Sequence, residues 1–171
     1  SFISTVKDSG VKTFIIHARK GILKGLSPRQ NRNIPPLNYQ KVYSIKDDFP
    51  ELEIIINGGI KNISEAKNHL NFVDGVMLGR AAYDDPFMLS DIDSEIYSNI
   101  KIEISRKDLL TEYLDYVHLM TKKGYDLKIM MKHVFGLKKG EKDAKRFRVK
   151  VAEIMSSSSL VENKDELLSM V

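Results

Sequence analysis

Three short apolar runs, with a helical pattern between each pair, constrain the fold of this chain more than any other feature of its sequence. They occupy residues 12–18 (KTFIIHA), 53–57 (EIIIN) and 74–78 (DGVML). Runs this short and with so few polar interruptions are expected of parallel strands that are buried on both faces. The sequence therefore predicts a parallel β-sheet in the first half of the chain.

Helical patterns fill the gaps between these strands. Residues 38–49 place apolar side chains at helical spacing and stop at Pro50. Residues 64–72 show the same spacing behind Asn62 or Ser64, either of which is a suitable N-cap. The first half of the chain is therefore predicted to have the element order βαβαβα.

The second half has a different periodicity, because after Ser90 the apolar runs give way to helical spacing. Helices are expected over residues 105–123, from about 127 to 137, over 142–155, and in a short segment after four serines at 156–159. The first of these opens with a Ser105 and Asp108 capping box and closes at Gly124. We predict an α/β fold followed by an all-α one, with domains of residues 1–95 and 96–171.

The 171 residues contain no cysteine, which excludes disulfide scaffolds, thiolate zinc sites, iron–sulfur clusters and cysteine nucleophiles within them. Any redox chemistry therefore needs a bound cofactor. His69, His118 and His133 lack partners at metal-ligand spacing, so no metal site is predicted. No apolar run approaches the roughly 20 residues that span a bilayer, and no signal-peptide pattern is present, so a cytoplasmic protein without membrane contact is expected.

The positive charge is concentrated in two stretches. The net charge is +4, from 27 basic and 23 acidic residues. Residues 122–150 hold 11 basic residues against three acidic ones, and residues 19–32 hold five basic residues and no acid. Two basic patches favour a polyanionic partner, because each neutralised phosphate releases counterions. The alternative is that these lysines belong to ordinary solvated helix faces.

Polar residues and glycines lie at the carboxyl ends of the three predicted strands: His17 closes the first, Asn57, Gly58 and Gly59 close the second, and Gly79 and Arg80 close the third. The carboxyl ends of parallel strands share one edge, where α/β proteins bind ligands. Glycines let backbone N–H groups approach an anion, and an arginine adds a bidentate cation. Single glycine turns and core histidines are common, but the three together favour a phosphate-bearing ligand.

Several short segments occur in the order in which they occur in one enzyme family. They are HARK (17–20), GLSP (25–28), NR (31–32), IPPL (34–37), NGGI (57–60), DGVM (74–77) and GRAAY (79–83). On these segments the chain resembles the tRNA-dihydrouridine synthases, and its loop of residues 21–37 is similar to the DusA type. The resemblance covers nearly the whole chain and is strongest over residues 14–89.

This resemblance implies a flavin-binding (β/α)₈ TIM barrel followed by a helical tRNA-binding domain. Such enzymes reduce a D-loop uridine of tRNA to 5,6-dihydrouridine with FMN and electrons from NADPH, and the DusA-type loop suggests position 20 or 20a. The three strands resemble the sixth, seventh and eighth of the barrel. By likeness the FMN-binding residues are His17, Asn57, Gly58, Gly59, Gly79 and Arg80, with the last four around the phosphate.

The resemblance also implies four tRNA-binding residues: Arg29, Arg32, Lys145 and Arg148. They fall inside the two basic stretches found from charge alone. Lys145 and Arg148 are three residues apart, so on a helix they share one face and can contact neighbouring phosphates. The alternative for each is an ordinary exposed surface charge.

Parts of the family pattern have no counterpart in these residues. Family members carry a proton-donating catalytic cysteine in the first half of a barrel of about 250 residues, whereas this chain supplies three strands and no cysteine. We therefore expect the C-terminal part of such an enzyme, with exposed strand edges, no catalytic residue of its own and no activity alone. Residues 1–10 fit this expectation, since they resemble a helix tail that ends at a glycine. The intact enzyme is expected to be monomeric.

Two alternatives remain open from the sequence. In one, the chain is a non-catalytic tRNA-binding fragment whose barrel strands are only structural. In the other, it belongs to another phosphate-binding flavin barrel, such as a dihydroorotate dehydrogenase relative, which leaves the basic helical tail unexplained.

Overall fold

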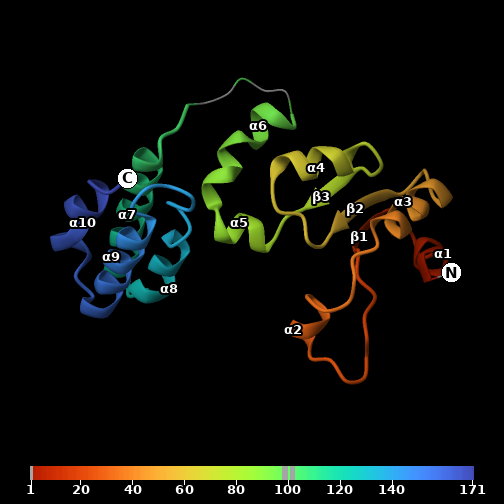
Figure 1. Cartoon of the computed structure of the whole chain (residues 1–171), viewed down its shortest axis with the longest axis horizontal. Helices are drawn as coiled ribbons and strands as arrows, with labels where there is room; N and C mark the ends of the chain where they lie inside the picture. The colour runs from red at the N-terminus through yellow and green to blue at the C-terminus, as the bar shows by residue number, and fades with distance from the viewer. Residues whose placement is uncertain (1, 98–99, 101–102) are drawn as a thin grey trace. The chain divides into compact units, whose positions relative to one another are not determined.

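The computed structural model describes residues 2–97, 100 and 103–171 (Figure 1). The chain forms two compact units, Ser1–Gly79 and Arg80–Val171. The border between them directly follows the third strand. The assignment of residues 1–95 and 96–171 to two functional domains stays a prediction.

The first unit contains the predicted parallel sheet. Its elements are α1 (Phe2–Lys7), β1 (Thr13–His17), α2 (Pro28–Asn31), α3 (Tyr39–Asp48), β2 (Glu53–Asn57), α4 (Ile63–Leu70) and β3 (Gly75–Met77). The strands run parallel in the order β1-β2-β3. Asn62, one of the two expected N-caps, begins α4 by accepting a hydrogen bond from the N–H of Glu65. The element order expected for this half is confirmed.

The two faces of this sheet differ in burial. Alternate side chains of a strand point to opposite faces, and Ile54 and Ile56 of β2 are fully buried on the face that α3 and α4 cover. On the other face Ile15 is 54% exposed and Met77 is 37% exposed. The expectation that these strands are buried on both faces is therefore wrong for the described part of this unit. The physical reason is that its helices cover one face only.

The second unit is helical. Its elements are α5 (Arg80–Asp84), η1 (Pro86–Asp91), α6 (Ile92–Glu95), α7 (Arg106–Lys122), α8 (Leu127–Met131), η2 (Lys132–Val134), α9 (Ala144–Ser157) and α10 (Leu160–Leu168). The predicted capping box begins α7: the Ser105 hydroxyl accepts from the N–H of Asp108, and the Asp108 carboxylate accepts from the N–H of Ser105. The expected helix from 127 to 137 is shorter, because a 3₁₀ turn replaces its second half.

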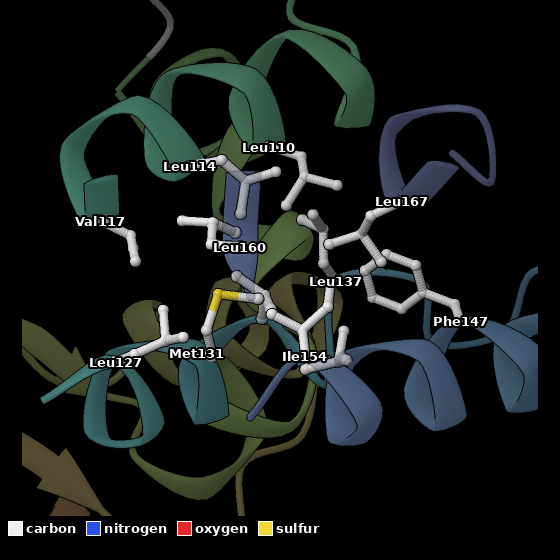
Figure 2. Packing of buried hydrophobic residues seen from close by; sticks show 12 residues of the cluster. Leu110, Leu114, Val117, Leu127, Met131, Leu137, Phe147, Ile154, Leu160 and Leu167 are labelled. Carbon is white, nitrogen blue, oxygen red and sulfur yellow. The ribbon is translucent and has the colours of Figure 1, made fainter. Parts of the chain in front are cut away.

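An apolar cluster holds the second unit together (Figure 2). Leu110, Leu114 and Val117 project from α7 and are fully buried, as their spacing of three and four residues requires. They meet side chains from α8, α9 and α10, among them Met131, Phe147, Ile154 and Leu167. The helical periodicity of this half therefore reflects a real core.

Arg106 joins the start of this bundle to the turn after η2. Its guanidinium lies 4.0 Å from the centroid of the Phe87 ring, and its Nε donates to the carbonyl of Leu137 at 3.0 Å. Gly136 packs against backbone, since a Cβ there would lie 2.4 Å from the carbonyl oxygen of Asp84. Among the described residues no helix is long and apolar enough to cross a membrane.

Candidate functional site

The ends of β1 and β2 bring three of the predicted site residues together. His17 and Asn57 are register partners, so their side chains leave the same face of the sheet, the face on which Ile15 is exposed. Gly58 follows directly, with a φ of +116° that L side chains rarely adopt. A Cβ at Gly58 would lie 3.0 Å from Cε1 of His17. The glycine is therefore required both by its backbone and by the imidazole beside it.

Gly59 packs closely against the side chains of Leu37 and Tyr39. Its φ is +78°, and a Cβ there would lie 2.5 Å from Cδ1 of Leu37 and 3.1 Å from the hydroxyl of Tyr39. The backbone of the glycine pair therefore packs directly on the segment that leads into α3. No other residue type fits this place without displacing its neighbours.

The imidazole of His17 has a defined orientation. The backbone N–H of Arg19 donates to its Nδ1 at 3.2 Å. This hydrogen bond fixes the orientation of the His17 ring at the end of β1.

The glycine pair leaves backbone donors available. Among the hydrogen bonds of the described residues, none uses the N–H of Gly58 or Gly59. Consecutive backbone N–H groups without side chains form concavities that bind anions. These backbone groups are suited to a phosphate. Within the described residues no three His, Asp or Glu side chains form a group that could hold a metal.

The two predicted site residues after the third strand belong to different units. Gly79 is the last residue of the first unit, and a Cβ there would meet nothing within 4 Å. Arg80 is the first residue of the second unit and begins α5. The structure therefore brings together His17, Asn57, Gly58 and Gly59, and the contribution of Gly79 and Arg80 stays a prediction.

The loop between β1 and α3 extends away from the sheet and carries α2 (Figure 1). At its base Arg19 pairs with Leu37 in an antiparallel bridge, and its Nε donates to the carbonyl of Pro35 at 2.7 Å. The charge pattern predicted that Arg19 belongs to a basic patch. In the structure its guanidinium instead bonds the two ends of the loop together.

The four predicted tRNA-binding residues are all exposed. Arg29 lies on α2 and Arg32 is its C-cap, while Lys145 and Arg148 lie on α9 on either side of the buried Phe147. Another cation of the second basic stretch, Lys150, forms an ion pair within the chain. Lys150 has a side chain only 11% exposed and pairs with Glu166, so that lysine does not belong to an open patch.

Sequence reasoning missed the side chains that support the glycine pair. Tyr39 donates to the carbonyl oxygen of Gly58 at 2.9 Å, and its ring meets the ring of His69 edge-on at 4.4 Å between centroids. Nδ1 of His69 lies 2.6 Å from the hydroxyl of Tyr43. Burial raises the pKa of both tyrosines and lowers the pKa of His69. From the sequence, these two tyrosines indicated only the apolar face of the predicted helix over residues 38–49.

Comparison with known proteins agrees with the resemblance drawn from the motifs. A family model described as dihydrouridine synthase (Dus) matches residues 1–170. The chain belongs to the dihydrouridine synthase family. This membership agrees with the parallel strands and the helices between them.

Curated relatives carry the same name. The chain is 44% identical over 147 residues to the tRNA-dihydrouridine(20/20a) synthase of Pseudomonas syringae pv. tomato, covering 86% of this chain and 44% of that protein. It is 43% identical over 152 residues to the synthase of the same name from Shewanella oneidensis, covering 89% of this chain and 45% of that protein. The dihydrouridine synthase chain thus spans somewhat less than half the length of these relatives.

Proposed function

We propose that this chain is the part of a tRNA-dihydrouridine synthase that binds the FMN phosphate and contacts tRNA. The observation that supports it best is the glycine pair after β2: Gly58 lies against the imidazole of His17, and neither glycine N–H donates in the hydrogen bonds among the described residues. The relatives' printed name supports a uridine at position 20 or 20a as the target.

The residues present fit the cofactor. The positive-φ backbone of Gly58 and Gly59 offers two consecutive N–H donors to an anion, and His17, whose ring lies against Gly58, is proposed to contact FMN beside them. We propose that Asn57, Gly79 and Arg80 complete the set, with Arg80 as a bidentate partner of the phosphate. Bound FMN supplies the hydride chemistry, with NADPH as the electron donor.

The proton of the reaction is proposed to come from outside these residues. The chain contains no cysteine, whereas the family pattern places its proton donor on one. The residues described here bind and orient: the strand ends hold the cofactor phosphate, and Arg29, Arg32, Lys145 and Arg148 hold the tRNA backbone. We propose that residues 1–95 supply the barrel part, that residues 96–171 supply the helical tRNA-binding part, and that the chain does not turn over alone.

A glycine substitution tests the cofactor site. Gly59→Ala places a Cβ against Leu37 and disfavours the observed φ of +78°, so FMN affinity is expected to fall on the order of tenfold. The matched control is Gly124→Ala, at a φ of +91° with nothing within 4 Å of its Cβ. Quenching of flavin fluorescence on titration with the chain measures both.

Two results would count against the proposal. Equal FMN affinity in Gly59→Ala and the parent chain contradicts the assigned phosphate site. A parent chain that binds tRNA but no flavin contradicts the cofactor role and supports the alternative of a non-catalytic tRNA-binding fragment.

A further inference from the structure

The hydroxyl of Tyr39 contacts the one peptide group that joins the two glycines. It donates to the carbonyl oxygen of Gly58 at 2.9 Å. This carbonyl shares its peptide group with the N–H of Gly59, and a trans peptide holds the C=O and the N–H on opposite sides. No cis peptide bond occurs among the described residues. The bond on the α3 side therefore directs the N–H of Gly59 away from α3.

Steric restriction alone does not fix this peptide. Both flanking residues lack a Cβ and have positive φ, a region that glycine enters as readily as negative φ. Rotation of the peptide about its two flanking bonds exchanges the sides of its oxygen and its N–H. In the exchanged orientation a carbonyl oxygen points toward the anion site, where it repels a phosphate. A specific contact is needed to hold the other orientation.

Tyr39 is itself held in place by buried neighbours. Its ring lies edge-on to His69, whose Nδ1 pairs with the hydroxyl of Tyr43. Burial, with a smaller contribution from the charge of Glu65, raises the pKa of Tyr39, so its hydroxyl keeps the proton that it donates. The donor is therefore fixed in position and in protonation.

We infer that Tyr39 is a positioning residue that sets the orientation of the Gly58–Gly59 peptide and so aims the N–H of Gly59 at the bound anion. The identity of that anion as the FMN phosphate rests on the proposed function. The orientation of the peptide does not, because it follows from a hydrogen bond within the chain.

The test removes one hydroxyl and keeps the ring. In ¹⁵N-labelled Tyr39→Phe of the full chain, we expect the Gly59 amide resonance to shift and broaden as the peptide samples both orientations. We expect FMN affinity to fall on the order of threefold to tenfold, the usual effect of one hydrogen bond. The matched control is Tyr113→Phe, which also removes a tyrosine hydroxyl that donates to a backbone carbonyl, that of Met130 at 3.0 Å in the second unit.

The two readouts separate the inference from the function on which it builds. A Gly59 resonance in Tyr39→Phe that superimposes on that of the parent chain overturns the positioning role. An equal shift of this resonance in Tyr113→Phe overturns it as well, because the effect is then a general one of losing a tyrosine hydroxyl. If the parent chain binds no FMN, the proposed function fails, while the Gly59 resonance still decides the role of Tyr39.

Discussion

At the scale of single residues, a few packed side chains support the glycine pair of the candidate site. His69 is 8% exposed, and its ring lies between Tyr39 and Tyr43. Burial disfavours the charged form of this imidazole and lowers its pKa, which makes the packing around it sensitive to acid. Charging this imidazole would place a cation in the layer that supports Tyr39 and, through it, the glycine pair.

His69 gives a prediction about pH. Burial lowers its pKa below the ordinary 6.5, and the charge of Glu65 opposes this only in part. The unfolded chain therefore binds more protons below about pH 6.5, and stability falls as the pH drops from there toward the folded-state pKa. We expect NMR titration of the His69 ring protons to give a pKa below 6.5.

The same histidine should affect unfolding. The urea midpoint is expected to fall between pH 7 and pH 5, and to fall less in His69→Gln, which cannot titrate. The carboxylates with lowered pKa, among them Asp74 and Asp108, lose their contributions only at lower pH. A His69 pKa at or above 6.5 would show that burial does not control this ring.

At the scale of elements, the loop that carries α2 is ordered by its own polar groups. Ser27 and Gln30 form a capping box at the start of α2. The side chain of Asn31 pairs with both backbone groups of Ile22, accepting from the N–H at 2.8 Å and donating to the carbonyl at 2.9 Å. This pairing crosses the loop and fixes the helix on which Arg29 lies and which Arg32 caps.

Removal of this pairing is therefore expected to loosen the loop. In Asn31→Ala the amide of Ile22 loses its acceptor, and its hydrogen exchange should accelerate on the order of threefold to tenfold. Asn33→Ala is the control, because the Asn33 amide donates to the carbonyl of Arg29 and not to Ile22. Unchanged exchange at Ile22 would mean that other contacts hold the loop.

At the scale of the whole molecule, the proposed tRNA contacts are drawn from both units. Arg29 and Arg32 belong to the first unit, and Lys145 and Arg148 belong to the second. A single polyanion that contacts all four releases counterions at each of them. The net charge of +4 understates this, because acidic residues elsewhere offset the two basic stretches.

Charge reversal of all four residues to Glu tests this arrangement. The slope of log K against log salt for tRNA binding is expected to become shallower by about 3, at about 0.7 to 0.9 per lost phosphate contact. The matched control reverses four exposed lysines outside the two stretches, Lys12, Lys41, Lys61 and Lys107. If the control weakens binding as much, net charge and not these four positions determines the affinity.

Much of the secondary structure follows from local sequence. The apolar runs predicted all three strands, and polar residues at fixed offsets predicted the caps at Asn62 and Ser105, because strand and helix starts depend on neighbouring residues. The motif HARK and the glycine pair also indicated the family. The helix after Leu127 was predicted too long, since spacing alone does not distinguish an α-helix that continues from one that tightens into a 3₁₀ turn.

The sequence by itself determined which residues stand at the strand ends, and glycines suit this place because L side chains rarely adopt the backbone found there. Only the tertiary structure decided how those residues are supported. Tyr39 reaches Gly58 across 19 residues and Arg19 reaches Pro35 across 16. Such contacts depend on how the chain returns on itself, which no local pattern encodes. The same holds for Lys150, whose ion pair with Glu166 forms only once α9 and α10 pack together.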